Sequence, residues 1–525
     1  MGVVISGSLT QGLEVRLGRG VSVEDVAVGR YVTIQGERRQ FFGLITDVRL
    51  ESLDPQTMPP DGPFAAQVLS GTINYASIKV LPVLSLNVLG VDEGPQPAKT
   101  VPAPFSVVLP ASQRDVEAIF GQEDEEHFYI GNPLDMETRL CLNLESFVQR
   151  SNGIFGKSGS GKTFLTRLVL IGILQKNLAV NLVFDMHNEY GWEGRGEGGR
   201  KVKGLKQLFR DRVVLFTLDK ESSQRRGVST DHTVQVGYDD IEAGDIELLQ
   251  DTLGLTEAAV SLCHRLPQHF GGGRWLERFL AVDNGEGLTE LTKSLNEHEG
   301  TVRHLRRRLE SLKRLPFLLP QARENSVQLI LDYLEKGMHV VLEFGRYDDL
   351  VAYILVANLL TRRLHDRYRE KVEQAQGQDA APPRPLVITI EEAHRFLSTN
   401  LSSQTIFGTI AREMRKYLVT MLVVDQRPSG IDEEVMSQLG SKFCCLLDNE
   451  RDVDSVLSGA AGRGELKTIL SRLEDKQQAL CFGHALPVPV VIRVREYGKS
   501  YKEFGLEEPE RLKEKAKEDI AKLWG

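Results

Sequence analysis

The chain has 525 residues, a formal net charge of −9 and a hydrophobic content of 41%. This composition is typical of a soluble globular protein, and the length predicts roughly two to four domains. No run of roughly 18 or more apolar residues occurs, and the N-terminus lacks a signal peptide pattern, so we expect a cytoplasmic protein without a membrane span. The charge argues against a globally basic nucleic-acid coat but allows a local basic channel. Five scattered cysteines without a CxxC pair predict reduced structural thiols.

The first part of the chain has short runs of β-branched and aromatic residues with glycines between them. These runs are LEVRL, RYVTIQG, FFGLITDVRL and QVLSGTINYASIKVLPVLSLNVL. The pattern favours a small β-barrel over residues 1–95. Proline-rich residues 91–105 predict a linker, and Ser112 predicts the cap of a short helix, so we assign residues 96–129 to a linker with that helix.

From about residue 130, apolar runs of strand length alternate with helical patterns. The runs are AVNLVFDMH, RVVLFTLD, MHVVLEF, PLVITIEEAH, YLVTMLVVDQ and SKFCCLLDN. This alternation predicts an α/β core over residues 130–500, built on a parallel sheet with helices on both faces. A helical insertion is expected at about 240–335, a surface loop at 373–385 and a charged C-terminal helix at 501–525.

The octapeptide GKSGSGKT at residues 156–163 matches the phosphate-binding pattern G-x-x-x-x-G-K-[ST]. Glycines let backbone N–H groups turn towards a phosphate, and the helix that follows points its positive end at the same anion. Lys162 should reach the β- and γ-phosphates, and the Thr163 hydroxyl should ligate Mg²⁺. An apolar strand before the loop and a helix after it favour this interpretation over a flexible loop. The predicted ATP-binding residues are Gly156, Lys157, Ser158, Gly159, Ser160, Gly161, Lys162, Thr163 and Phe164.

An ATPase of this kind also needs acids for the metal shell and for the attacking water. The run LVITIEEAH places Glu391 and Glu392 at the end of an apolar strand. We expect Glu391 near Mg²⁺ and Glu392 as the group that polarises water, although two adjacent acids can also be a solvated helix start. Gln426 ends another apolar strand, where it could contact the γ-phosphate or be an ordinary polar residue at a strand end.

Several stretches taken together resemble the HerA family of hexameric DNA translocases, within the HerA/FtsK group of P-loop motors. They are IFGKSGSGKT, VFDMHNEY, ITIEEAH, IAREMRKY and VVDQRPSGI, in that order. The N-terminal barrel and the run PVPVVIRV fit this family as well, so the resemblance covers nearly the whole chain. It implies a RecA-like core, an N-terminal HAS-barrel and a ring of six subunits with ATP between them.

The resemblance also implies roles for single residues. Asp185 of FDMHNEY matches an acid expected near the nucleotide, with a turn residue at a strand end as the alternative. Arg415 of AREMRKY is the candidate arginine finger, a group that neutralises transition-state charge, and an exposed helix charge is its alternative. Arg150 stands where the family also uses an arginine. Met414 departs from the glycine that the family often has there.

These patterns support an ATP-driven translocase or helicase acting on double-stranded DNA, with a nuclease or other effector as partner in DNA end processing or anti-phage defence. The alternative is a ring that senses ATP and gates an effector without moving DNA. A secretion or conjugation motor is disfavoured because no membrane segment is found. Residues 199–206 (GRKVKGLK) are the candidate DNA-contacting loop, whereas the basic stretch at 303–314 is better explained as a solvated helix face.

Overall fold

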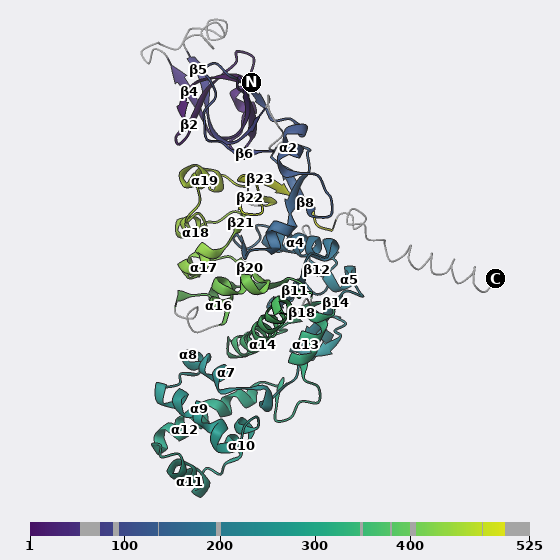
Figure 1. Cartoon of the computed structure of the whole chain (residues 1–525), viewed down its shortest axis with the longest axis vertical. Helices are drawn as coiled ribbons and strands as arrows, with labels where there is room; N and C mark the ends of the chain where they lie inside the picture. The colour runs from purple at the N-terminus through teal and green to yellow at the C-terminus, as the bar shows by residue number, and fades with distance from the viewer. Residues whose placement is uncertain are drawn as a thin grey trace, which may run out of the picture. The chain divides into compact units, whose positions relative to one another are not determined.

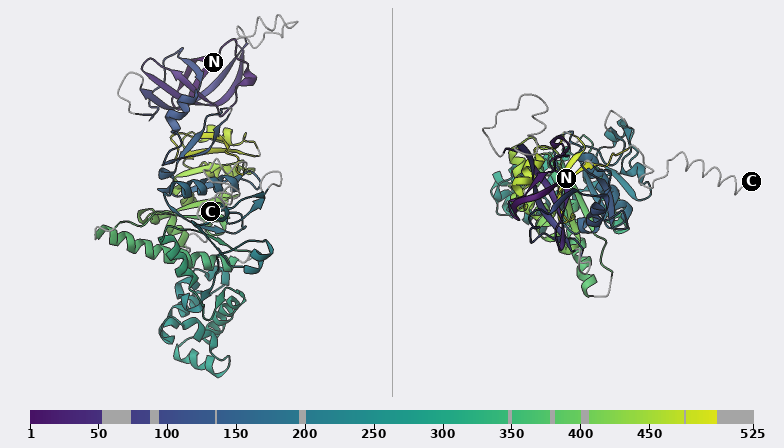
Figure 2. Two further views of the ribbon diagram at one scale, coloured as in Figure 1. Left: turned by 90° about the vertical axis from the view of Figure 1, so that its right-hand side faces the viewer. Right: turned by 90° about the horizontal axis from the view of Figure 1, so that it is seen from above.

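The computed structural model describes residues 1–52, 74–87, 94–134, 136–195, 201–346, 350–377, 381–399, 406–474 and 476–498 (Figures 1 and 2). These residues form two compact units. Unit 1 comprises Met1–Thr166, Asp425–Ser429 and Leu439–Arg495, and unit 2 comprises Arg167–Val424, Gly430–Gln438 and the residues from Glu496 onward. The helix expected at 501–525 lies outside the described residues. No helix in the described part of the chain has the length and apolar character needed to cross a membrane.

Unit 1 begins with a closed antiparallel barrel, drawn in purple in Figure 1. Its strands are β1 (Gly2–Ser8), β2 (Gly12–Leu17), β3 (Tyr31–Gln35), β4 (Arg39–Ser52), β5 (Asn74–Asn87) and β7 (Val107–Pro110). They pair in the order β2-β1-β7-β3-β4-β5, and β5 pairs with β2 again, which closes the sheet. Alternate side chains such as Val15, Ile45 and Val80 fill the interior. The small barrel predicted for the N-terminal region is therefore confirmed.

The barrel extends further along the chain than the sequence suggested. β6 (Gln96–Pro97) adds to β5, and β7 lies between β1 and β3, so both strands fall within residues expected to be a linker. Val108 of β7 is completely buried, but prolines surround this strand and hide its alternation in the sequence. The short helix follows as predicted: α2 (Gln113–Phe120) has Ser112 as its cap, and the Asp115 side chain completes a capping box.

The rest of unit 1 is a mixed sheet in which only one pair is parallel. The strands are β8 (His127–Pro133), β9 (Leu140–Asn143), β10 (Asn152–Phe155), β21 (Ser441–Cys444), β22 (Gln478–Gly483) and β23 (Val490–Val494). β10 runs parallel to β21, whereas β21-β22-β23-β8-β9 are antiparallel, so the parallel sheet predicted for the core does not extend over these last strands. Short connections such as the one between β22 and β23 favour antiparallel pairing. The helices are α3 (Leu144–Val148), α18 (Glu450–Val456) and α19 (Arg463–Leu470).

Unit 2 contains the parallel sheet that the sequence predicts. β14 (Val213–Thr217), β18 (His339–Glu343), β11 (Val180–Asp185), β19 (Leu386–Glu391) and β20 (Val419–Asp425) are neighbours in that order. All these pairs are parallel, and every residue of the five strands is buried. Their carboxyl ends therefore lie at one edge of the sheet, where an α/β protein normally binds its ligand.

Helices cover this sheet and link its strands. The larger ones are α4 (Lys162–Lys176), which begins in unit 1, α13 (Ser326–Glu335), α14 (Leu350–Gly377) and α16 (Ile406–Glu413). The short elements are α5 (Leu205–Leu208), α6 (Lys220–Arg225), α17 (Glu433–Gln438), β12 (Gly194–Arg195), β13 (Lys201–Val202), β15 (His232–Thr233), β16 (Val236–Gly237) and β17 (Leu318–Leu319). Because α14 continues to Gly377, the loop expected at 373–385 begins later than the sequence suggested.

A cluster of helices interrupts unit 2 between β16 and β17 (teal, Figure 1). It comprises α7 (Ala243–Glu247), α8 (Gln250–Leu253), α9 (Glu257–Phe270), α10 (Trp275–Ala281), α11 (Glu286–Ser294) and α12 (Glu299–Glu310). Trp275 and Phe279 are buried in its core. Arg362 of α14 forms an ion pair with Asp245 of this cluster at 2.8 Å. The helical insertion is present, but it ends before α13, which packs on β18.

Candidate nucleotide site

The phosphate-binding motif forms a loop between β10 and α4 in unit 1. Gly159 and Gly161 have φ angles of 78° and 96°, conformations that glycine adopts without strain. The backbone N–H groups of Ser158, Gly159 and Gly161 donate to no acceptor among the described residues. Lys162 and Thr163 form the first turn of α4, whose N-terminus carries a partial positive charge. This concentration of unpaired donors and positive charge is suited to a phosphate.

The loop is anchored at its start by contacts that require a glycine. The Gly156 N–H donates to the Asp425 carbonyl at 3.2 Å, and the Lys157 N–H donates to the Leu446 carbonyl at 2.9 Å. A Cβ at Gly156 would lie 2.6 Å from Ser160 Oγ and 2.7 Å from Cys445 Cβ. The side chain of Cys445 is buried here, and burial raises the pKa of its thiol to about 11, so it packs as a neutral group.

Three further polar residues of unit 1 differ in their relation to this loop. Gln426 directly follows Asp425, whose carbonyl accepts the Gly156 N–H, so the structure brings Gln426 to the start of the loop. Lys157 donates a hydrogen bond to Asp448 at 3.1 Å. Arg150 precedes β10, at the end opposite the loop, where its side chain lies against Gly440. The structure therefore does not bring Arg150 to the phosphate loop of its own chain.

In unit 2, three acids lie at the carboxyl edge of the parallel sheet. Asp185, Glu343 and Glu391 are the last residues of the neighbouring strands β11, β18 and β19, and all three are buried. The Asp185 carboxylate accepts the N–H groups of Glu189, Tyr190 and Gly191 at 2.7, 2.8 and 3.2 Å. Asp185 therefore shapes the turn that follows β11, which was the alternative role considered for it.

Glu391 and Glu343 each have one buried carboxylate oxygen, Oε2 and Oε1 respectively, without a hydrogen-bond partner among the described residues. Glu343 forms an ion pair with Arg226 through its other oxygen, whereas Glu391 has no ion pair among the described residues. Burial, followed by the charge of Asp185, raises the pKa of Glu391 to about 8. Burial also raises the pKa of Glu343, to about 7. An orphaned carboxylate oxygen among several acids is a suitable ligand for a hard divalent cation such as Mg²⁺, so the residues fit the predicted metal.

Glu392 has a strained backbone and lies between two histidines. Its φ and ψ angles of 48° and 45° are left-handed, a conformation that is uncommon outside glycine and is often found at functional sites. His187 Nε2 lies 3.6 Å from Glu392 Oε1, and His394 Nδ1 lies 3.6 Å from Oε2. The Glu392 carboxylate raises the pKa of His187 to about 8. Both histidines belong to the motifs FDMHNEY and EEAH, but nothing in the sequence pattern indicated that they would lie around Glu392.

The candidate arginine finger lies on the surface of unit 2. Arg415 is exposed on a short 3-10 turn after α16, and it has no ion-pair partner among the described residues. Arg412 pairs with Glu434 at 3.2 Å, and Lys416 lies 4.0 Å from Glu413. Met414, at the family's frequent glycine position, is completely buried and is the first residue of the 3-10 turn that follows α16. Arg415 is therefore the unpaired cation of this segment.

Each of the two basic stretches has some of its cations paired with acids of unit 2. In the candidate DNA loop, Lys206 pairs with Asp231 at 2.9 Å, and Lys201 pairs with Glu193. Within the second stretch, Arg306 is buried and pairs with Glu310 on the same helix, at 3.2 Å. These pairs reduce the charge that either stretch offers to a polyanion.

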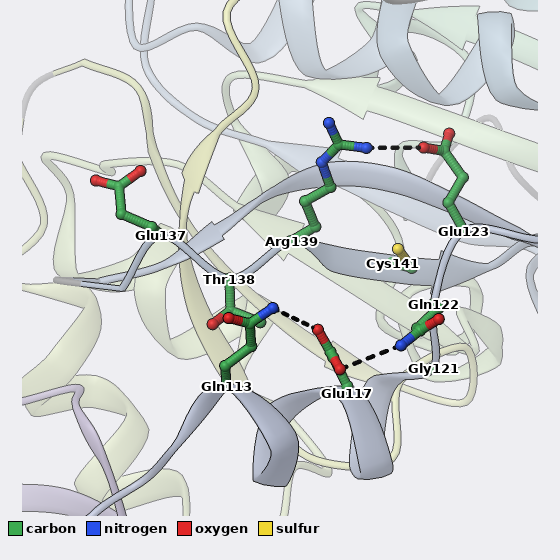
Figure 3. Close-up of a pocket in the computed structure, with 9 residues that line it drawn as sticks. All are labelled: Gln113, Glu117, Gly121, Gln122, Glu123, Glu137, Thr138, Arg139 and Cys141. Carbon is green, nitrogen blue, oxygen red and sulfur yellow. Dashed lines mark hydrogen bonds and ion pairs between the residues drawn. The ribbon is translucent and has the colours of Figure 1, made fainter.

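Unit 1 also contains a polar cavity of about 440 Å³ between α2 and the β8–β9 hairpin (Figure 3). Gln113 and Gln122 donate to Glu117 at 2.7 and 3.1 Å, and Arg139 lies 3.6 Å from Glu123. Because these groups satisfy one another and no nucleotide-motif residue lines the cavity, we assign it no part in nucleotide binding.

A glycine loop with free N–H groups, a following helix that carries Lys162 and Thr163, and buried acids at the ends of parallel strands define the class of the protein. It is an α/β ATPase of the P-loop type. This class confirms the enzyme predicted from the sequence.

Comparison with known proteins identifies the family. The family model described as "Helicase HerA, central domain" matches residues 128–364, and the "HAS barrel domain" model matches residues 1–71. Two models of HerA-type proteins therefore match the chain, and the resemblance to the HerA family that its motifs predicted is confirmed.

Several curated relatives are similar over most of their length. The DNA double-strand break repair helicase HerA of Pyrococcus furiosus is 23% identical over 79% of this chain and 78% of its own. The protein of the same name from Saccharolobus solfataricus is 24% identical over 89% of this chain and 88% of its own. Among solved structures, the bacterial conjugative coupling protein TrwBdeltaN70 in complex with sulphate has a TM-score of 0.46 and 11% identity, covering 74% of this chain and 94% of its own.

Proposed function

We propose that this ATPase moves along double-stranded DNA as a ring of six subunits. The observation that carries the proposal is the phosphate loop of unit 1, with its unpaired N–H groups next to Lys162 and Thr163. Similarity to relatives named DNA double-strand break repair helicase HerA supports DNA as the polymer. A chain with a net charge of −9 would hold DNA through local basic positions that grip phosphates without reading bases.

The residues at the strand ends would share the work of ATP hydrolysis. Lys162 binds the β- and γ-phosphates, and Glu392 polarises the water that attacks the γ-phosphorus. Thr163 and Glu391 would hold Mg²⁺, which supplies charge neutralisation at the phosphate oxygens when it is bound. Gln426 contacts the γ-phosphate or the water and so detects whether hydrolysis has occurred. Support for the Glu392 role comes from its strained backbone and its two histidine neighbours.

A ring explains the residues that the phosphate loop of the same chain does not use. Arg415 is exposed and pairs with no acid in the described part of the chain, so it is available to a neighbouring subunit as an arginine finger. Arg150 lies at the far end of β10 from its own phosphate loop, which likewise favours a role towards a neighbour. Asp185 supports the site indirectly, since its carboxylate shapes the turn that carries His187. Sharing each ATP site couples hydrolysis to movement between subunits.

We further propose that the ring works with a nuclease or other effector protein, which docks on the barrel or on a ring face. The names of the relatives favour a role in DNA end processing, and anti-phage defence is the other setting in which such a motor would act. Co-elution of the hexamer with a nuclease expressed from the same genome tests this part.

The direct test compares ATPase rates with and without long linear duplex DNA. Lys162→Ala should abolish turnover because it removes a group that binds the γ-phosphate, and Glu392→Gln should lower turnover about 10²- to 10⁴-fold because it removes the group that polarises the attacking water. Lys371→Ala, on α14, is the matched control and should keep the wild-type rate. Stimulation by DNA that vanishes in Lys162→Ala supports the proposal. Hydrolysis at a rate that DNA does not change would favour a ring that gates an effector.

A further inference from the structure

Two arginines lie side by side at the edge of the unit 2 sheet opposite the acids. Arg212 immediately precedes β14, and Arg384 lies two residues before β19. The Arg212 Nη2 group donates to the Asn177 Oδ1 atom at 3.1 Å, and the Arg384 Nη1 group donates to the same oxygen at 3.0 Å. Because both bonds end on one atom, the two guanidinium groups are neighbours.

No carboxylate of the described residues forms an ion pair with either arginine. Other arginines of unit 2, such as Arg362 and Arg367, form ion pairs with acids. Within the described part of the chain, neither Arg212 nor Arg384 forms an ion pair, and the bond to Asn177 is the only side-chain hydrogen bond of each. Burial, followed by the charge of Arg384, lowers the pKa of Arg212, as expected where two like charges remain unneutralised.

A buried histidine next to the pair also keeps a donor without an acceptor. His339 begins β18, and its Nδ1 accepts the Asn181 N–H at 3.1 Å, so the neutral ring carries its proton on Nε2. That Nε2 atom is buried and has no hydrogen-bond acceptor among the residues that the structure describes. Burial, followed by the charges of Arg212 and Arg384, lowers the pKa of His339 to about 3. His339 therefore stays neutral and adds no charge to that of the two arginines.

The backbone around the arginines keeps them in place. Asn177 follows α4 with a φ angle of 55°, and Gly337 follows α13 with a φ angle of 80°. A Cβ at Gly337 would lie 2.9 Å from Arg384 Nη1, so the glycine lets this side chain lie against the turn. The carboxyl ends of the two helices attract the arginines through partial negative charge only. Each guanidinium has five N–H donors, and Asn177 engages one on each, so most donors remain available.

We propose that Arg212 and Arg384 form a phosphate-binding site at this edge of the sheet. Two adjacent guanidinium groups offer pairs of donors that match the oxygens of a phosphate, which is why arginine predominates in such sites. The phosphate comes either from the backbone of duplex DNA or from free phosphate. The DNA source rests on the proposed function, whereas the site itself does not.

The first experiment measures the affinity of the full-length protein for a short linear duplex over a series of salt concentrations, without ATP. We expect the double variant Arg212→Gln/Arg384→Gln to bind about tenfold more weakly, and its slope of log affinity against log salt to fall by about 0.9 for each DNA phosphate that it no longer neutralises. Arg367→Gln/Arg369→Gln removes two paired cations from α14 and should leave both values unchanged. The double variant should keep the wild-type ATPase rate without DNA, which shows that it is folded.

The second experiment titrates inorganic phosphate into Lys162→Ala protein by calorimetry, so that the phosphate loop does not contribute. If the heat of phosphate binding disappears when the substitutions Arg212→Gln/Arg384→Gln are introduced into the Lys162→Ala protein, and if these substitutions leave DNA binding unchanged, the ligand is free phosphate. Arg212→Lys/Arg384→Lys keeps the charge but not the paired donors, and should bind either ligand more weakly than wild type with the salt slope retained.

If neither DNA nor phosphate binding changes in the glutamine variant, the proposal is overturned. A change in oligomer mass with both ligands unaffected would instead assign the arginines to acids of a neighbouring subunit, which also overturns it. A loss of DNA affinity in a protein whose ATPase rate does not respond to DNA would leave this site standing and reject the proposed function.

Discussion

Glu391→Gln tests whether Glu391 is a neutral, destabilising acid in the nucleotide-free protein. The substitution keeps the size of the side chain and removes only its ability to ionise. Glu391 is buried at the end of β19, its Oε2 has no partner, and burial raises its pKa from 4.5 to about 8. The protein therefore retains a proton on Glu391 at neutral pH that the unfolded chain has already released.

The sign of the effect follows from this difference in proton binding. Below pH 4.5 the folded and the unfolded states both hold the proton on Glu391, so ionisation of this group does not change the free energy of unfolding. Between pH 4.5 and about pH 8 only the folded state holds it, so stability falls as pH rises. At about 1.4 kcal/mol for each pH unit, the loss in free energy of unfolding above pH 8 is at most about 5 kcal/mol. Part of this loss arises from the charge of Asp185 next to Glu391.

The assay is urea unfolding of wild type and Glu391→Gln in EDTA between pH 4 and pH 9. The two proteins should be equally stable near pH 4, and the variant should become progressively more stable than wild type towards pH 8.5. Adding Mg²⁺ and a non-hydrolysable ATP analogue should reduce this advantage, because a cation favours the charged carboxylate. Stability curves that stay parallel over the whole range would refute the reasoning.

Three further changes probe the site. Gly156→Ala should weaken ATP binding at least about tenfold and destabilise unit 1 by about 1–3 kcal/mol, because the added Cβ would lie 2.6 Å from Ser160 Oγ. Calorimetry and urea unfolding measure the two effects, and Gly464→Ala, whose Cβ would meet open space on α19, is the control. His187→Ala should lower the free energy of unfolding by about 1 kcal/mol below pH 6.5, and this loss should fade as pH rises through about 8. Urea unfolding at pH 6 and pH 9 measures the difference. Arg415→Ala should retain ATP binding while turnover falls about 10³-fold, with Lys416→Ala near wild type; a normal rate for Arg415→Ala would exclude the finger.

The sequence predicts the parallel half of the fold well because its strands are completely buried. Runs such as 213–217 and 386–391 are apolar throughout most of their length, and such runs are typical of strands covered on both faces. The phosphate loop is equally clear, since Gly159 and Gly161 have the positive φ angles that their residue type suggests. Both predictions succeed because a short stretch of sequence alone fixes the local structure, through burial in the strands and through positive φ angles in the loop.

The failures occur where structure depends on distant partners. β7 lies between β1 and β3 in the barrel with one buried residue, Val108, and it is a strand only because it pairs with these two neighbours. The antiparallel strands of unit 1 are apolar runs like the parallel strands of unit 2. The amino-acid pattern of a buried strand does not indicate the direction in which it pairs. The placement of His187 beside Glu392, and of Arg212 beside Arg384, joins residues far apart in the sequence, so no spacing rule could have found either pair.

The central claim, that ATP hydrolysis drives movement along duplex DNA, is tested most directly by displacement of a third strand from a DNA triplex. The account predicts that wild-type protein strips the third strand only with ATP and Mg²⁺, and that Lys162→Ala and Glu392→Gln do not strip it. A wild-type protein that hydrolyses ATP at a DNA-stimulated rate but leaves the triplex intact would contradict translocation. It would make the ring a gate for its effector.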